Sequence, residues 1–303
     1  ALFFEVAFYW AVPVFFMLTG ATLLNYREKY STRVFFKKRL TRAFLPFLLW
    51  SFLKASELII KGRLEDVSIF SVIDLIINTK LPSMDVYWFF IPLFGIYLSI
   101  PVLSLIAKKE NISILWYMVA CAFITWSCFP LIFELFHIPF NGSLLFPLNG
   151  GGYILFVLLG YLLFNIELSK KSRYFIYCAG ILCFLFRYLG TYYLSISEGV
   201  LVRTFFSYTQ FHSVLLAVSV FVLIKYWNNE WLYSHPKVIR YLSSCSLGIY
   251  LMHRIFMDKF LRYFHVASDD VYWRFLRAFL TYIICLILVS IIKRIPYVRI
   301  LAP

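Results

Sequence analysis

The sequence contains few charged residues, and acidic residues are the scarcer kind. Charged residues make up 15% of the 303 residues, with 15 Asp and Glu against 29 Lys and Arg. Hydrophobic residues make up 62%, and the mean hydropathy is +0.81. Such a composition excludes the class of soluble globular proteins. We therefore expect an integral membrane protein that has no room for a separate soluble domain.

Metal-binding and redox motifs are also missing. All six cysteines fall within long apolar segments and none belongs to a C-x-x-C pair, so we interpret them as small buried hydrophobic residues. No two of the five histidines have the spacing of a zinc site. The sequence thus predicts that the protein uses no metal.

The chain contains long apolar runs. A membrane-spanning helix needs about 20 mostly apolar residues, whereas a β-barrel needs short alternating strands. Continuous runs such as YILFVLLGYLLF (153–164) favour helices. We predict an all-α, polytopic transmembrane helix bundle that forms a single membrane domain over residues 1–303. Its nine expected spans lie at about 1–24, 43–60, 86–107, 112–134, 147–166, 174–194, 207–227, 241–262 and 273–292.

The basic residues alternate between the connections on the two sides of this bundle. With the C-terminus inside, the inner stretches hold 18 lysines and arginines and the outer stretches hold 7. This bias predicts a multi-pass plasma (inner) membrane protein with a cytoplasmic C-terminus. Because the net charge of +14 is spread over many loops rather than gathered in one patch, no nucleic-acid partner is expected.

Nine spans with a cytoplasmic C-terminus place residue 1 outside, which is an unusual arrangement. The sequence begins without a Met, a cationic lead or a small-residue cleavage site, so its start does not resemble a signal peptide. We therefore expect one more N-terminal helix in the full-length protein, which would give ten spans with both ends cytoplasmic.

Four cations fall within six residues of FFKKRLTRAFLPFLLW (35–50), at the cytoplasmic end of a span. If a helix begins by Phe36, Lys38, Arg39 and Arg42 share one face. Cations at a helix N-terminus oppose the helix dipole, so a bound anion would explain them. Anionic lipid is the simpler explanation, at roughly 1 kcal/mol for each cation. The residues themselves leave both explanations open, and Pro46 is expected to free a backbone carbonyl near Arg42.

Three ionisable residues fall inside predicted spans, where such groups are costly and often functional. His253 is either a catalytic group or a packed histidine that donates to a carbonyl. Arg187 would be satisfied by glycan binding or by an ion pair. Glu5 either orients a catalytic histidine or is a carboxylate that reaches water at the outer interface.

Several segments carry a family resemblance. VPVFFMLTGATLL (12–24), FFKKRLTRAFLPFLLWS (35–51), YWFFIPLFGIYLSIPVLS (87–104) and LSSCSLGIYLMHRIF (242–256) follow one another in the order and spacing of motifs in the acyltransferase-3 family. The chain resembles this family of integral membrane acyltransferases over essentially its whole length. The family moves an acyl group, commonly acetyl from cytoplasmic acetyl-CoA, to a hydroxyl of a cell-surface or lipid-linked glycan.

The resemblance implies roles for particular residues. Arg39 and Arg42, helped by Lys38, would hold the phosphates of acetyl-CoA, and Trp88 and Tyr250 would line the route to the acceptor. The family's catalytic histidine lies on a helix that precedes residues like 12–24, and no such helix is present in this sequence. The principal general base is therefore not identified, and His253 and Glu5 are the catalytic candidates among the residues present.

A rival function belongs to a different class. An exporter or flippase for a glycan or lipid-linked glycan would use the same cationic mouth to hold phosphate and would need no histidine base. A membrane scaffold without catalytic activity is a third possibility. In every case membrane lipid is an expected partner, and an acyl-CoA donor and a glycan acceptor are expected only for the enzyme.

Overall fold

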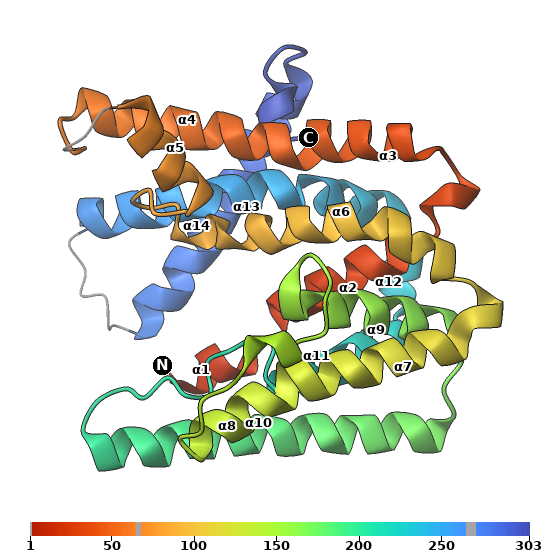
Figure 1. Ribbon diagram of the computed structural model, residues 1–303. Helices are drawn as coiled ribbons and strands as arrows, with labels where there is room; N and C mark the ends of the chain where they lie inside the picture. Colours follow the sequence, from red (N-terminus) through yellow and green to blue (C-terminus); the bar gives the residue numbers. More distant parts are fainter. Residues whose placement is uncertain (1, 65–67, 265–270) are drawn as a thin grey trace. The chain divides into compact units, whose positions relative to one another are not determined.

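The computed structural model describes residues 2–64, 68–264 and 271–303, and these residues form helices and connections without any strand (Figure 1). Helices account for 79% of the structure, which confirms the predicted all-α fold. The α-helices are α1 (Leu2–Ala7), α2 (Ala11–Leu23), α3 (Thr32–Arg39), α4 (Leu45–Ile60), α5 (Ile69–Ile77), α6 (Phe90–Ile106), α7 (Ile112–Ala122), α8 (Phe129–Leu135), α9 (Ile154–Asn165), α10 (Lys170–Glu198), α11 (Phe211–Lys225), α12 (Glu230–Ser234), α13 (Pro236–Phe264) and α14 (Val271–Arg294).

Short helical turns of other types join or extend these helices. Two π-helical segments interrupt longer helices, at Leu40–Phe44 and Phe123–Cys128. The 3-10 turns lie at Tyr26–Glu28, Asp85–Phe89, Lys109–Asn111, Gly142–Leu144, Gly151–Tyr153 and Arg299–Leu301.

Several helical stretches are suited to a membrane. Among the described residues, six are long and apolar enough to cross one, and the shorter stretches Gly151–Asn165 and Phe211–Lys225 are also apolar. The six are Leu2–Glu28, Thr32–Ile60, Asp85–Ile106, Lys109–Leu135, Lys170–Glu198 and Phe275–Arg294. These helices fit a multi-pass membrane protein, while the expected count of nine spans is not confirmed.

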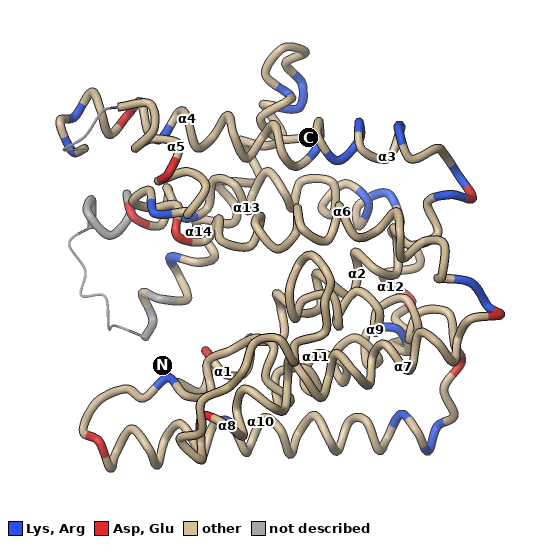
Figure 2. Tube along the Cα trace, viewed as in Figure 1, with Lys and Arg blue, Asp and Glu red and all other residues tan. Residues whose placement is uncertain are grey.

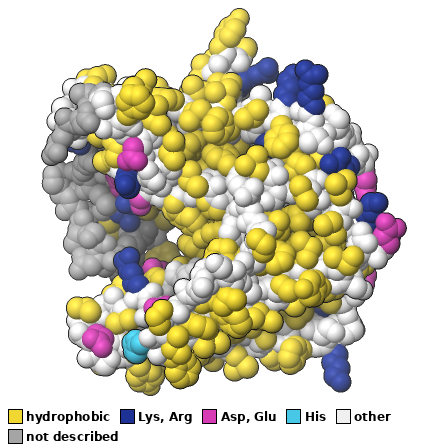
Figure 3. All heavy atoms as spheres, in the orientation of Figure 1, with side chains coloured by type: hydrophobic (Ala, Val, Ile, Leu, Met, Phe, Trp, Pro, Cys, Tyr) yellow, Lys and Arg dark blue, Asp and Glu magenta, His cyan; other side chains and the backbone are white. Residues whose placement is uncertain are grey.

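The surface agrees with a membrane environment. Hydrophobic side chains cover much of the face shown in Figure 3. On α10, the large apolar side chains of Phe175, Ile181 and Leu182 are exposed by 77%, 60% and 65%. Such exposure is unfavourable in water, whereas lipid tails are as apolar as these side chains.

The chain divides into two compact units, and each is made of two separate stretches. The first unit comprises residues 1–32 and 92–228, and the second comprises residues 33–91 and 229–303. Helices α1, α2 and α7 to α11 lie in the first unit, and α4, α5 and α12 to α14 lie in the second. Helix α3 lies in the second unit apart from its first residue, Thr32, and α6 begins in the second unit and continues into the first.

Helix α9 is the centre of the first unit. Every residue from Ile154 to Leu163 is buried, because α2, α7 and α11 all pack against this helix. The contact with α2 is the closest of these. A Cβ atom added to Gly20 would lie 1.9 Å from the Val157 carbonyl oxygen, and one added to Gly160 would lie 1.9 Å from that of Met17. Only glycine lets the two backbones approach so closely.

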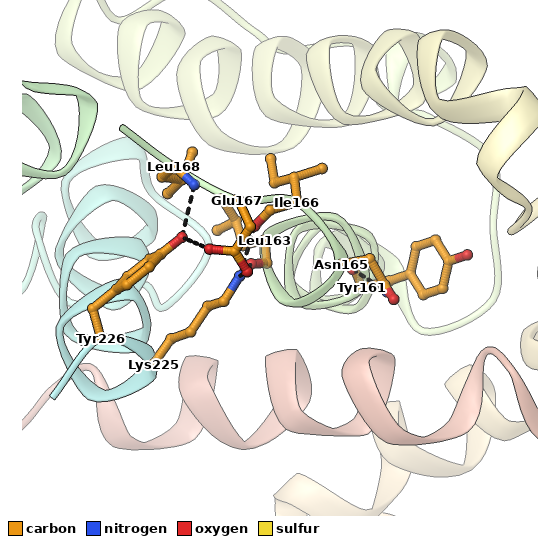
Figure 4. Close-up of polar contacts among 8 residues, drawn as sticks. All are labelled: Tyr161, Leu163, Asn165, Ile166, Glu167, Leu168, Lys225 and Tyr226. Atoms are coloured by element: carbon orange, nitrogen blue, oxygen red, sulfur yellow. Dashed lines mark hydrogen bonds and ion pairs between the residues drawn. The ribbon is translucent and has the colours of Figure 1, made fainter. Parts of the chain in front are cut away.

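A lysine from α11 caps the C-terminal end of α9 (Figure 4). The Lys225 ammonium donates to the carbonyl oxygens of Leu163 and Ile166, at 3.1 and 2.6 Å. The last carbonyls of a helix have no partner within the helix, and a cation there also suits the helix dipole. This contact therefore ties α11 to the end of the central helix.

The next residue, Tyr226, fixes the connection between α9 and α10 (Figure 4). Its hydroxyl accepts from the Leu168 backbone N–H at 2.7 Å and donates to the Glu167 carboxylate at 2.9 Å. This hydrogen bond and the nearby Lys225 charge lower the pKa of Glu167. Tyr226, which follows the last residue of α11, thus holds two successive residues of this connection, Glu167 and Leu168.

The second unit is held together by its own core. Cys245, Ile249 and Met252 of α13 pack with Cys285 and Val289 of α14 in one buried cluster. The C-terminal turn closes this unit onto α4, where the Trp50 indole N–H donates to the Leu301 carbonyl oxygen at 2.9 Å. Helices α4, α13 and α14 are therefore joined within a single unit.

Candidate active site

The cationic segment lies inside a helix that is continuous from α3 through the π-helical segment to α4. This helix begins at Thr32, four residues before the start that the spacing argument assumed. The N–H groups without a helical partner therefore belong to residues 32–35, and the effect of the dipole falls off within that first turn. The cations at positions 37–42 lie beyond that first turn, so the prediction that they oppose the helix dipole does not hold.

The π-helical segment Leu40–Phe44 carries Arg42. Within it, the Leu45 N–H bonds to the Leu40 carbonyl, five residues earlier rather than four. Pro46 follows directly, and it lacks an N–H and crowds the carbonyl four residues before it, which is that of Arg42. The wider turn accommodates this crowding, and single π-helical turns inside α-helices are frequent at functional sites.

The cations in this region differ in exposure. Lys38 and Arg39 are half-buried, and Arg42 is exposed. The Arg39 guanidinium carbon lies 5.7 Å from the centroid of the Phe35 ring, a distance suited to a cation–π contact. Figure 2 shows several basic residues following one another along α3. The first acidic residue after Thr32 is Glu57, so the helix presents a purely cationic stretch.

Aromatic contacts connect this helix to α13. Phe47, five residues after Arg42, is 3% exposed, and its ring centroid lies 5.7 Å from that of Tyr87 and 5.2 Å from that of Phe90. The Tyr87 hydroxyl in turn donates to the Leu251 carbonyl oxygen of α13 at 2.7 Å. The cationic helix and α13 thus share a packed aromatic layer.

The same layer positions Tyr250. Its hydroxyl donates to the Val86 carbonyl oxygen, and its ring contacts those of Phe89 and Phe90 at centroid distances of 5.6 and 5.8 Å. Trp88 belongs to the 3-10 turn that contains Val86 and Phe89, and it is half-buried. Two of the motifs recognised in the sequence therefore meet in the second unit.

His253 lies one turn further along α13, and its ring centroid is 5.4 Å from that of Tyr250. Its Nδ1 is 2.6 Å from the Tyr250 carbonyl oxygen. A carbonyl oxygen can only accept, so Nδ1 carries a proton and, in the neutral imidazole, Nε2 carries the lone pair. The histidine is thus oriented by its own helix and has the form that a general base requires.

The neighbouring cation, Arg254, is compensated by two acids. Its guanidinium forms ion pairs with Asp85 at 3.0 Å and with Asp258 at 3.4 Å. The sequence reasoning missed both partners. Asp258 had a signal, because it lies four residues after Arg254 on the same helix, whereas Asp85 is 169 positions away and gave none.

Glu5 and Arg187 lie in the first unit. Glu5 is exposed on the short helix α1. Arg187, on α10, is 1% exposed, and its guanidinium stacks on the Tyr9 ring at 3.3 Å. No ion pair joins Glu5 and Arg187, although both are described. The second unit thus holds Lys38, Arg39, Arg42, Trp88, Tyr250 and His253, and the first holds these two residues.

Metal ligands are the last element of a possible site. In the part of the chain that the structure describes, no three His, Cys, Asp or Glu side chains gather as a metal site would require.

The fold and these side chains define a helical membrane protein with a cation-rich helix beside an oriented histidine. Comparison with family models identifies its family: the model described as an acyltransferase domain matches residues 1–294, so the chain belongs to the acyltransferase-3 family. This match confirms the resemblance that the motifs indicated, covers both units and makes the protein a membrane acyltransferase that uses an acyl donor. No curated protein and no solved structure matches the chain in the same comparisons.

Proposed function

We propose that the protein is an O-acetyltransferase of the plasma (inner) membrane. It transfers an acetyl group from cytoplasmic acetyl-CoA to a hydroxyl of a cell-surface or lipid-linked glycan, and residues 1–303 act as a single domain with a cytoplasmic C-terminus. The observation that carries this proposal is the arrangement within the second unit. There the cationic helix and the helix of His253 pack against one aromatic layer.

The donor binds at the cationic helix. Arg39 and Arg42 form charge-assisted hydrogen bonds to the phosphates of acetyl-CoA, and Lys38 adds a third positive charge. Guanidinium groups suit this task because their planar N–H pairs match two phosphate oxygens at once. The π-helical segment supports the proposal, because it places a wider helical turn at Arg42.

Transfer then proceeds beside α13. Of the two catalytic candidates in this sequence, His253 is the one we assign as the base: its Nε2 takes the proton of the acceptor hydroxyl, and the oxygen attacks the thioester carbonyl. A C–O bond forms, the C–S bond breaks, and the CoA sulfur receives the proton from His253. The products are the glycan ester and free CoA. Trp88 and Tyr250 line the acceptor side, where the Tyr250 ring lies against the His253 ring.

The donor site is tested with full-length protein in vesicles and labelled acetyl-CoA. A hydrogen bond to a charged group contributes about 1.5–3 kcal/mol, so we expect Arg39→Ala and Arg42→Ala each to raise the KM for acetyl-CoA roughly 10- to 100-fold. Arg33→Ala is the matched control, because Arg33 is an exposed arginine near the start of the same helix, and its KM should stay within about twofold of wild type.

Two results would contradict the proposal. Transfer that is unchanged in both Arg39→Ala and Arg42→Ala would exclude the donor site. Absence of transfer by the wild type, together with movement of a glycan across the vesicle membrane, would instead favour the exporter that the sequence left open.

A further inference from the structure

Arg187 is a charged residue in a place where charge is unfavourable. It lies eleven residues before the end of α10, which corresponds to roughly 16 Å of helix. It is 1% exposed and belongs to the largest fully buried side chains of the described structure. A buried cation is strongly destabilising unless a counter-charge and hydrogen bonds compensate it. The contacts of Arg187 therefore show which of these compensating groups are missing.

The observed contacts of the guanidinium are all with neutral groups. Its Nη1 donates to the Ser213 hydroxyl at 3.4 Å, and its carbon atom lies 3.3 Å from the centroid of the Tyr9 ring and 5.0 Å from that of Phe206. None of the described ion pairs includes Arg187. Ring faces and a hydroxyl stabilise a cation in part, but they supply no full negative charge.

The unused hydrogen-bonding capacity is concentrated on one edge of the side chain. Nε and Nη2 of Arg187 are buried and have no hydrogen-bond partner in the described structure. The N–H groups of these two atoms lie in one plane and point in the same direction, and their spacing matches the two oxygens of a carboxylate. One turn further along α10, the hydroxyl of Thr191 is 0% exposed and also lacks a described partner.

The polar residues nearby already use their acceptors. The Gln210 amide donates to the Thr204 carbonyl oxygen at 2.7 Å, and its Oε1 accepts from Ser207 N–H at 3.3 Å and from His212 Nε2 at 3.1 Å. The Ser213 hydroxyl lies 2.9 Å from the Ser207 carbonyl oxygen. These acceptors are therefore already occupied. Glu5 of α1 interacts with Arg187 electrostatically, but it is exposed and forms no described ion pair with the guanidinium, so a carboxylate in direct contact with Arg187 is left to a ligand.

We propose that Arg187 and Thr191 form a carboxylate-binding site of the first unit, and that its ligand is an acidic saccharide. Nε and Nη2 of Arg187 hold the two carboxylate oxygens, and the Thr191 hydroxyl donates a third hydrogen bond. Only the choice of a saccharide rests on the function proposed above, while the carboxylate rests on Arg187 itself.

The cover of the site can open without breaking a helix. Tyr9 lies in the turn between α1 and α2, and Phe206 lies in the irregular connection between α10 and α11. The Tyr9 hydroxyl donates to the Phe206 carbonyl oxygen, so one hydrogen bond joins the two covering residues. Separation of Tyr9 from Phe206 would break this hydrogen bond and uncover the face of the guanidinium on which the Tyr9 ring stacks.

The test measures binding rather than catalysis, so its outcome does not depend on whether acetyl transfer is detected. Full-length protein in lipid nanodiscs is heated with methyl glucuronoside or with methyl glucoside, which differ only in a carboxylate in place of a hydroxymethyl group. We expect the acidic sugar to raise the unfolding midpoint by about 2 °C or more above the neutral sugar, since binding to the native state stabilises it.

The variants identify the residues responsible. Arg187→Gln abolishes the difference between the two sugars, and Thr191→Val weakens binding of the acidic sugar several-fold. Arg203→Gln is the matched control, because it removes the same charge from an exposed arginine of the connection between α10 and α11, and it leaves the difference intact.

A variant without added sugar separates a ligand site from a structural role. Because Arg187 is a buried cation without a described ion pair, Arg187→Met should leave the unfolding midpoint of the ligand-free protein unchanged or raise it. The proposal is overturned if this variant is clearly less stable, if both sugars shift the wild type equally, or if only Arg203→Gln removes the difference. An unchanged response to the acidic sugar in Thr191→Val would overturn it as well.

Discussion

Two histidines in apolar surroundings have different ring nitrogens available. His253 donates from Nδ1 to the carbonyl of Tyr250, which leaves the Nε2 lone pair. His212 faces the Gln210 Oε1 with Nε2, so there Nε2 carries the proton and the lone pair of Nδ1 faces the Ser213 hydroxyl. His212 is enclosed in the network beside Arg187, whereas His253 is half-buried. Of these two residues, His253 is the one that can serve a substrate as a base.

We expect His253→Gln to lower the rate of acetyl transfer by about 10²- to 10⁴-fold, which is the usual contribution of a general base. Glutamine keeps much of the side-chain size but cannot take a proton. The KM for acetyl-CoA should change little, because the donor site proposed above consists of Lys38, Arg39 and Arg42 rather than His253. Initial rates over a range of acetyl-CoA concentrations measure both quantities.

His235→Gln is the control for this variant, since His235 is an exposed histidine just before α13. Its rate should equal that of wild type. A His253→Gln protein that keeps more than about a tenth of the wild-type rate would show that another group is the base.

At this scale the sequence selected candidate residues but did not predict their contacts. His253 and Arg187 were selected because an ionisable group within a span is unfavourable without a function. The partners of these residues could not be inferred, because Asp85 pairs with Arg254 across 169 positions and Ser213 approaches Arg187 from another helix.

At the scale of the helices, the sequence located several apolar helices but not their true ends. Residues 43–60 were expected as a span, and the helix in fact runs from Thr32 to Ile60. Hydropathy falls at the cations, so a pattern of apolar residues ends there, whereas the backbone hydrogen bonds continue. The change to π-helical geometry at Leu40 does not alter the pattern of apolar residues. Pro46 is the local sequence feature that indicates it.

The contact between α2 and α9 gives a prediction about stability. Gly20→Ala and Gly160→Ala would each place a methyl group 1.9 Å from a backbone carbonyl oxygen of the other helix. Neither backbone can yield without moving a central helix, so we expect each variant to lose about 3 kcal/mol or more of stability. Unfolding of purified protein in mild detergent measures this loss.

Gly142→Ala provides the comparison, because a Cβ at Gly142 would meet no atom within 4 Å. This variant should unfold within about 0.5 kcal/mol of wild type. Equal stability of Gly20→Ala and Gly142→Ala would mean that α2 and α9 are less closely packed than described.

For the whole molecule, the orientation in the membrane can be tested at the two ends of α10. This helix has 29 residues and a length of roughly 44 Å, enough to cross a bilayer fully. The distribution of basic residues predicts that Lys171 is cytoplasmic and Arg203 is outside. We expect a membrane-impermeant maleimide to label Arg203→Cys in intact cells and Lys171→Cys only after the cells are opened.

The control is wild-type protein treated in the same way, which gives the background labelling of the six native cysteines. If Lys171→Cys is labelled in intact cells and Arg203→Cys is not, the orientation is the reverse of that predicted. Labelling of both positions in intact cells would contradict a full crossing by α10.

Composition and the length of the apolar runs were enough to predict the membrane class and the all-α fold, because both depend on how many apolar residues follow one another. The division into two units depends instead on contacts between distant stretches. Residues 33–91 join residues 229–303, and residues 1–32 join residues 92–228. No local pattern encodes such pairings.

These pairings set an order for assembly during synthesis. The unit that contains the cationic helix cannot be completed until Leu301 has left the ribosome, because the Trp50 indole donates to the carbonyl of this residue, 251 positions later. At about 5–20 residues per second, the delay is roughly 10 to 50 s. During that interval the face of α4 that later receives the C-terminal turn is uncovered, so lipid or the insertion machinery has to shield it.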